Sequence, residues 1–163
     1  MGRTVIILSL SAILIVAGIG VYALLSGNNG DNSSDDGPTK PDVENMDLIM
    51  TVDGKKVDVL WEDNPSVKAI KELAYDGLTI DMKEYGNFEQ TGSMPSSVVK
   101  DDSWIEVGAG DIVLYRGVQI CLYFNDNAYD FTRLGKISNM ADSEIKDMLD
   151  KDSVKVVLTL SKK

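Results

Sequence analysis

The sequence predicts a mainly β fold with two helices, built around a barrel or a sandwich core. Two β-rich runs at 112–115 and 118–124 flank Arg116-Gly117, which is a signal for a two-residue hairpin turn. A third β-rich run at 129–134 follows the polar triplet 125–127. Three adjacent strands this apolar need a hydrophobic core to cover them, and the other elements are expected to be arranged around them.

Turn residues also predict the register of two hairpins. In the hairpin just described, Tyr115 is expected to face Val118. Farther from the turn, the same register places Val113 opposite Ile120. Asp53-Gly54 is a strong type I′ signal, and the same argument places Met50 opposite Val57. In both hairpins apolar side chains meet across the strands and stabilise the pairing.

The remaining elements follow from capping residues and periodicity. Asn64 is expected to cap a helix that has Pro65 at its first position, and helical spacing of apolar residues predicts a second helix near the C-terminus. The segment 83–100 has three breakers and no sustained period, so we expect an ordered excursion there. The predicted strands are 46–52, 55–62, 78–82, 103–107, 112–115, 118–124, 129–134 and 154–160, and the predicted helices are 65–76 and 141–149.

Composition excludes several classes of function. The 163 residues carry 16 basic and 26 acidic side chains, a net charge of −10, and no histidine, so no nucleic acid partner is expected. Without histidine and with one cysteine, zinc sites and Ser-His or Cys-His catalysis are excluded, and no metal or cofactor is expected. Cys121 is expected to be a buried structural thiol. Asp81, Glu84 and Glu89 are too scattered for a carboxylate pair or an oxygen cage, and a solvated surface is expected for them.

The N-terminal part predicts attachment to a membrane. Residues 5–25 contain no charge and would span roughly 31 Å as a helix, about the thickness of a hydrocarbon core. Arg3 is the only basic side chain before this run, so we expect a single-pass anchor with its N-terminus in the cytoplasm and the rest of the chain outside. A cleaved signal peptide ending at Ala23, which would make the protein secreted, is the alternative.

Three parts of the chain follow from this. Residues 1–25 are the anchor or signal segment, and 26–45 form a flexible acidic linker with almost no aliphatic side chains. Residues 46–163 form the folded domain. Asn32 begins a glycosylation sequon, whose use depends on the host, and the oligomeric state stays open.

The order of elements, together with four short segments, resembles the small prokaryotic cyclophilin-like domains. The segments are LWEDNP at 60–65, FEQTGSMP at 88–95, GDIVLY at 110–115 and YDFTRLGKI at 129–137. The resemblance covers roughly residues 46–160. It implies a closed eight-stranded β-barrel with a helix over each open end.

Cyclophilins proper are peptidyl-prolyl isomerases, and the resemblance is incomplete at their catalytic residues. Their catalytic arginine lies on the strand after the first helix, but the matching strand 78–82, LTIDM, contains none. Phe131 stands near the position of their groove histidine, while Phe88 and Gln90 match the hydrophobic and glutamine positions. Arg133 is the one candidate substitute for the catalytic arginine. The alternative is a structural arginine at the rim of the barrel, paired with a neighbouring acid such as Asp130 or Asp111.

We therefore expect a membrane-tethered, extracytoplasmic module that binds a peptide or a small molecule and has no classical prolyl isomerase activity. Many of the domain's aromatic residues lie in or beside the segments that would form a groove, and those beyond the core are expected to line an aromatic cleft. A prolyl isomerase with a non-standard site at Arg133 and a structural envelope protein are the two alternatives. The expected groove residues are Phe88, Gln90, Tyr129, Phe131 and Arg133.

Overall fold

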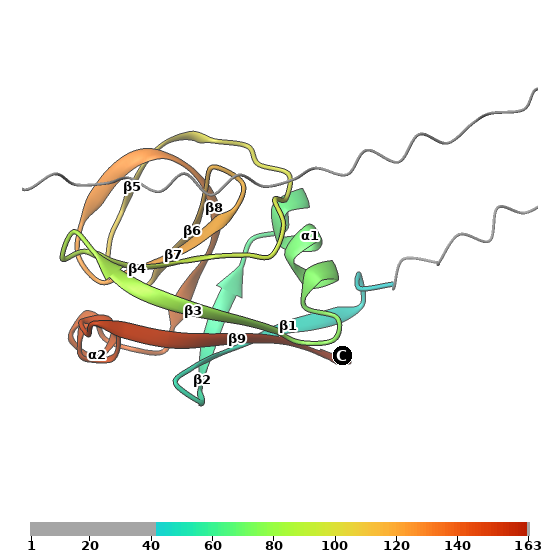
Figure 1. The fold of residues 1–163 in the computed structure, drawn as a ribbon, viewed down its shortest axis with the longest axis horizontal. Helices are drawn as coiled ribbons and strands as arrows, with labels where there is room; N and C mark the ends of the chain where they lie inside the picture. Colours follow the sequence, from blue (N-terminus) through green and yellow to red (C-terminus); the bar gives the residue numbers. More distant parts are fainter. Residues whose placement is uncertain (1–41, 163) are drawn as a thin grey trace, which may run out of the picture. The chain divides into compact units, whose positions relative to one another are not determined.

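The computed structural model describes residues 42–162, which form nine strands and two helices (Figure 1). The predicted anchor, and the predicted linker up to residue 41, lie outside the described residues. None of the helices in the described part is long and apolar enough to cross a membrane. The elements are β1 (Met46–Val52), β2 (Lys55–Trp61), α1 (Pro65–Leu73), β3 (Leu78–Tyr85), β4 (Glu89–Ser93), β5 (Ser103–Val107), β6 (Asp111–Tyr115), β7 (Gln119–Tyr123), β8 (Asn127–Ser138), α2 (Asp142–Leu149) and β9 (Ser153–Lys162).

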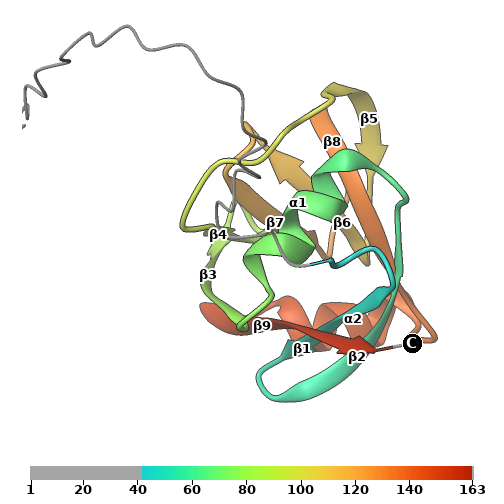
Figure 2. The same ribbon diagram turned by 90° about the vertical axis from the view of Figure 1, so that its right-hand side faces the viewer.

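Eight of these strands form a ring. The order is β2-β1-β9-β3-β4-β7-β6-β8, and a further pairing between β2 and β8 joins its two ends. Neighbouring strands are antiparallel. β5 lies outside the ring and pairs with β8. The two helices lie on opposite sides of the ring in Figure 1, and in Figure 2, which is seen from the side of α1, α1 lies in front of the strands.

The predicted number of ring strands is correct, but one member is wrong. The sequence predicts β5 in the ring, but β4 takes that place, and β4 lies in the segment for which the sequence predicts an excursion. The sequence of β4, EQTGS, has no apolar residue, so no alternation marks it as a strand. It is held by its pairing with β3 on one side and β7 on the other. Gly92 permits this, since a Cβ there would lie 2.5 Å from the Ile80 side chain.

The β6–β7 hairpin differs from its predicted register by one residue. Arg116 and Gly117 have φ values of 52° and 75°, and the Val118 amide donates to the Tyr115 carbonyl, as in the predicted turn. The ladder begins one residue later, with Tyr115 opposite Gln119. Val118 is therefore an extra residue between the turn and the ladder, and every later pair is shifted by one.

The β1–β2 hairpin and the first helix form as predicted. Met50 lies opposite Val57, and Asp53 and Gly54 have the positive φ values that a type I′ turn requires. The Asn64 side chain accepts a hydrogen bond from the Val67 amide at 2.9 Å, which makes Asn64 the N-cap of α1. α1 ends at residue 73, three residues before the predicted end, and α2 lies within a residue of its predicted bounds.

Buried side chains form two clusters. The larger one fills the inside of the ring and includes the apolar faces of both helices, with Ile70 of α1 and Leu149 of α2 fully buried. The smaller one lies on the outer face of β6, β7 and β8. Its buried members are Val107, Val113, Cys121, Tyr123 and Phe131. Because β6 and β7 contribute alternate residues to both clusters, they are buried on both faces, and the outer cluster is the base of the site described next.

Candidate functional site

An aromatic pocket of about 340 Å³ opens on the outer face of the ring, above the smaller cluster. Its walls come from the end of β3, the turn that follows it, and strands β4, β6, β7 and β8. All six aromatic residues that line it belong to segments expected to form a cleft: Tyr85, Phe88, Tyr115, Tyr123, Tyr129 and Phe131. We call this site the aromatic pocket.

Ring-to-ring contacts hold these side chains in place. The Phe88 ring lies parallel to the Tyr123 ring, with 6.0 Å between centroids, and Phe131 contacts Tyr123 at 5.8 Å. Tyr115 and Tyr129 contact Phe131 at 6.1 and 5.7 Å. Such pairs each add about 0.5–1.5 kcal/mol beyond the burial of apolar area. Tyr123 and Phe131 are buried and form the floor, whereas Tyr129 is exposed at the rim.

The floor also contains a carboxylate, Glu89 of β4, which is only 7% exposed. It lies opposite Tyr123 in the β4–β7 ladder, and its Oε2 has no hydrogen-bond partner among residues 42–162. Burial raises the pKa of Glu89, and interactions with the Tyr123 hydroxyl and the Cys121 thiol offset part of that rise. The expectation that Glu89 lies on a solvated surface is wrong. The reason is that β4 was not recognised, and this strand turns Glu89 toward the aromatic side chains.

The groups around Glu89 are neutral. The Asn127 side chain donates to the Tyr123 hydroxyl at 3.3 Å, and the Thr91 hydroxyl lies 3.4 Å from the Cys121 sulfur. Burial raises the pKa of Cys121 to about 12, as expected for a structural thiol. Burial and the neighbouring Glu89 also raise the pKa of Tyr123. At neutral pH both groups therefore keep their protons, and of the residues that the structure describes at the floor, Glu89 alone can carry a charge.

Three of the five expected groove residues, Phe88, Tyr129 and Phe131, come together in the aromatic pocket. Gln90 does not. It follows Glu89 in β4, so it points to the inner face of the ring, where it is fully buried. Its Nε2 donates to the carbonyl oxygens of Leu149 at 2.8 Å and Lys151 at 2.6 Å. Gln90 thus holds the end of α2 instead of facing the pocket.

Arg133, the fifth expected residue, is used in an ion pair. Its Nη1 donates to Asp111 Oδ1 at 2.6 Å, and its Nη2 donates to the Glu106 carbonyl at 3.2 Å. Asp111 is buried, and Lys136 lies 3.6 Å from its other oxygen. The structural pairing with Asp111, weighed as an alternative from the sequence, is what the structure contains. Arg133 borders a separate hollow of about 570 Å³ and is not among the residues that line the aromatic pocket.

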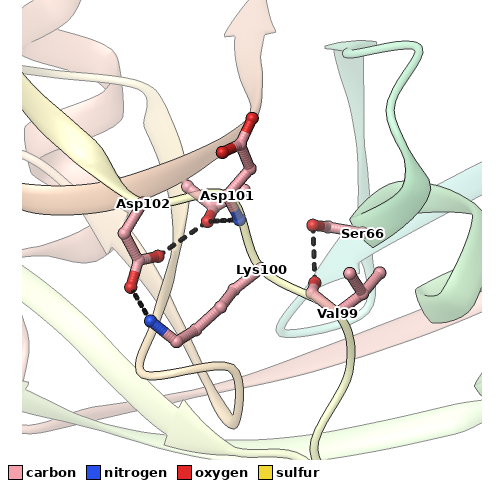
Figure 3. A network of polar contacts seen from close by, with 6 residues as sticks. Ser66, Val99, Lys100, Asp101 and Asp102 are labelled. Carbon is pink, nitrogen blue, oxygen red and sulfur yellow. Dashed lines mark hydrogen bonds and ion pairs between the residues drawn. The ribbon is translucent and has the colours of Figure 1, made fainter.

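That second hollow is bordered by a polar network that fixes the loop between β4 and β5 (Figure 3). The Ser66 hydroxyl of α1 donates to the Val99 carbonyl at 2.7 Å. The Asp101 amide donates to the Thr132 hydroxyl, which donates in turn to Asp102 at 2.7 Å. Lys100 forms an ion pair with Asp102. These groups satisfy one another, so the network anchors the loop to α1 and β8. In the described part of the chain no group of side chains could hold a metal ion.

Comparisons with known proteins agree with this fold. Residues 50–161 match the sequence profile of the Cyclophilin-like family. The chain is also similar to the solution structure of the hypothetical protein AF2241 from Archaeoglobus fulgidus, at 19% identity and a TM-score of 0.52. That similarity covers 74% of this chain and 98% of the other, and it concerns the fold alone. No curated protein matches the chain.

Proposed function

Because the chain belongs to the cyclophilin-like family, we propose that its folded domain is a closed β-barrel that binds a ligand in the aromatic pocket and lacks classical prolyl isomerase activity. The observation that carries this proposal is the pocket itself. It combines an apolar aromatic lining with a few convergent polar groups and one carboxylate of raised pKa. That combination is typical of binding sites for small molecules and short peptide segments.

The arrangement favours binding over isomerisation. Lowering the barrier to X-Pro rotation requires a donor aimed at the amide as its resonance is lost, and one such donor contributes about 2.7–4 kcal/mol. β3 has no arginine, and the guanidinium of Arg133 is paired with Asp111. Within residues 42–162, neither an arginine nor a lysine lines the aromatic pocket. A binding module is therefore the better account of this site.

A ligand screen by NMR tests the proposal. The full chain, labelled with ¹⁵N and kept in a maltoside detergent, is mixed with a fragment library and with short proline-containing peptides. We expect at least one compound to shift amide signals of β4, β7 and β8 around the pocket, and Tyr129→Ala to weaken its binding severalfold. Tyr75→Ala removes another exposed tyrosine, outside the pocket, and serves as the matched control. Binding confined to the hollow beside Arg133, or no binding at all, would contradict the proposal and favour a structural role.

We also propose that the domain is held outside the cytoplasmic membrane by the segment 5–25. The support is the uncharged run itself, with Arg3 before it and an acidic stretch after it. Protease added to intact cells should remove the domain. Digestion only after lysis would contradict this topology, and a mature chain that begins at Leu24 would identify a secreted protein.

A further inference from the structure

Building on the proposed binding function, we propose that the aromatic pocket takes a small organic ammonium ion, held against the ring faces with its charge directed at Glu89. The inference goes beyond ligand binding as such, since it names the charge and the chemical class of the ligand. It comes from the position of one carboxylate in an otherwise neutral aromatic site.

Charge is the first argument. Among the described residues that line the pocket, Glu89 is the only charged one, and its Oε2, which has no hydrogen-bond partner among them, is buried at the floor. A buried carboxylate is unfavourable unless a donor or a positive charge compensates it. The Tyr123 hydroxyl and the Cys121 thiol offset only part of this cost, and no described residue lining the pocket is a cation, so a ligand that brings a positive charge would supply the missing partner. The net charge of −10 further raises the local concentration of cations.

The groups that face Glu89 exclude an internal counter-ion. From β7 it meets Tyr123 and Cys121, which hold their protons at neutral pH. Thr91 of its own strand and Asn127 of β8 are uncharged lining residues, and Tyr85 lies opposite it in the ladder with β3. An anion entering the pocket would meet only repulsion from Glu89, and a neutral ligand would leave its oxygen without a strong partner.

The aromatic lining is the second argument. Ammonium and guanidinium groups are attracted to the faces of aromatic rings, and quaternary ammonium ions are bound in cages of such rings. One lining ring already makes such a contact outside the pocket, since the Arg116 guanidinium carbon lies 4.9 Å from the centroid of the Tyr115 ring. Arg116 belongs to the hairpin turn and is not a lining residue, so it leaves the floor open.

Size is the third argument. A volume of about 340 Å³ lies at the lower end of the range for ligand pockets. It suits a compact ammonium group on a short chain. We therefore take a free small molecule as the occupant, and the side chain of a protein partner is an outcome that the experiment distinguishes.

Titration calorimetry on the full chain in a maltoside detergent tests the inference. Choline is the probe, and 3,3-dimethylbutan-1-ol is the control because it has nearly the same shape without the charge. We expect choline to bind at least tenfold more tightly. Glu89→Gln should bring the affinity for choline down to that for the alcohol, whereas Asp76→Asn, a change at an exposed acid outside the pocket, should leave it unchanged.

Each other outcome has a defined meaning. Equal binding of choline and the alcohol would overturn the ammonium inference and leave the proposed binding function standing. Absence of binding by both, together with an empty ligand screen, would overturn both proposals. A trimethyllysine peptide that binds more tightly than choline would overturn the assignment to a free small molecule. If Glu89→Gln does not fold, Tyr129→Leu replaces it as the test variant. Loss of this ring at the rim should lower the affinity for choline more than the affinity for the alcohol. An equal loss of affinity for both compounds would contradict the inference.

Discussion

Glu89 and Tyr123 lie directly opposite each other in the β4–β7 ladder, and the tyrosine hydroxyl interacts with the buried carboxylate. Burial raises the pKa of both side chains. The pair therefore places an acid in an apolar aromatic site at the expense of folding stability. Groups that destabilise a fold are frequent at functional sites, where a ligand compensates them.

Replacing the Glu89 carboxylate should stabilise the ligand-free protein against unfolding. Because the pKa of Glu89 is raised in the folded state, the protein loses stability as pH rises from the usual glutamate range toward the raised value. Glu89→Gln removes this loss. We expect the variant to have a free energy of unfolding higher by on the order of 1 kcal/mol at pH 7, and a difference close to zero at pH 3. Urea unfolding at the two pH values measures this, and a less stable variant at pH 7 would contradict it.

Affinity for choline should depend on pH in the opposite direction. Only the ionised form of Glu89 attracts a cation, so binding should strengthen as pH rises through the raised pKa of this residue. Titrations at several pH values between 4 and 8 measure the change. Glu89→Gln should give a flat profile. A wild-type profile that is equally flat would show that Glu89 does not act on the ligand.

Breaking the Arg133–Asp111 pair should reduce stability and not binding. Arg133→Ala leaves the buried Asp111 with the Gly108 amide and with Lys136 at 3.6 Å as its only cation among the described residues, and we expect a loss of about 1–3 kcal/mol. The double variant Arg133→Ala/Asp111→Asn should recover part of this loss, because the unpaired charge is then gone. Urea unfolding of the single and double variants tests the stability, and a choline titration tests the site. Weaker choline binding by either folded variant would place Arg133 in the binding machinery.

Gln90 should behave as a structural residue too. Gln90→Leu removes both hydrogen bonds to the carbonyl groups at the end of α2, and we expect a loss of about 1–3 kcal/mol in the free energy of unfolding. Hydrogen exchange should show faster opening of α2. Choline affinity, measured well below the unfolding midpoint, should stay within twofold of wild type. A large loss of affinity with α2 intact would return Gln90 to the ligand site.

The full chain should not accelerate cis–trans exchange of an Ala-Pro test peptide above background. The strand that would bear the catalytic arginine has none, and Arg133 is paired with Asp111. Acceleration that disappears in a folded Arg133→Ala variant would make the protein an isomerase with a non-standard site. Acceleration that survives this change would also contradict the prediction.

Sequence reasoning succeeds where local chemistry decides the structure. Asp53-Gly54 requires positive φ values and thereby determines a turn and its register, and Asn64 caps a helix through its own side chain. It fails where distant strands decide. The polar strand β4 exists through its pairing with β3 and β7. Val118, the residue that shifts the β6–β7 ladder, accepts a hydrogen bond from the distant Met94 amide.

The same reason explains the errors at the site. Glu89 and Gln90 are neighbours in an unrecognised strand, and alternation sends one to the pocket and the other to the inner face. Without the strand, no pattern separates their roles. The aromatic residues are easier to predict, since they are concentrated in or beside the segments expected to form a groove.

The most direct test of the account is the location of a bound ligand. Nuclear Overhauser effects between the methyl protons of choline and the protein are measured on the full chain in a maltoside detergent. The account predicts contacts to ring protons of Tyr123 and Phe131, at the floor beside Glu89, and their loss in the Glu89→Gln variant. Contacts confined to other surfaces would contradict the account. The absence of any contact at about 10 mM choline would contradict it too, because the binding free energy would then be weaker than about −3 kcal/mol.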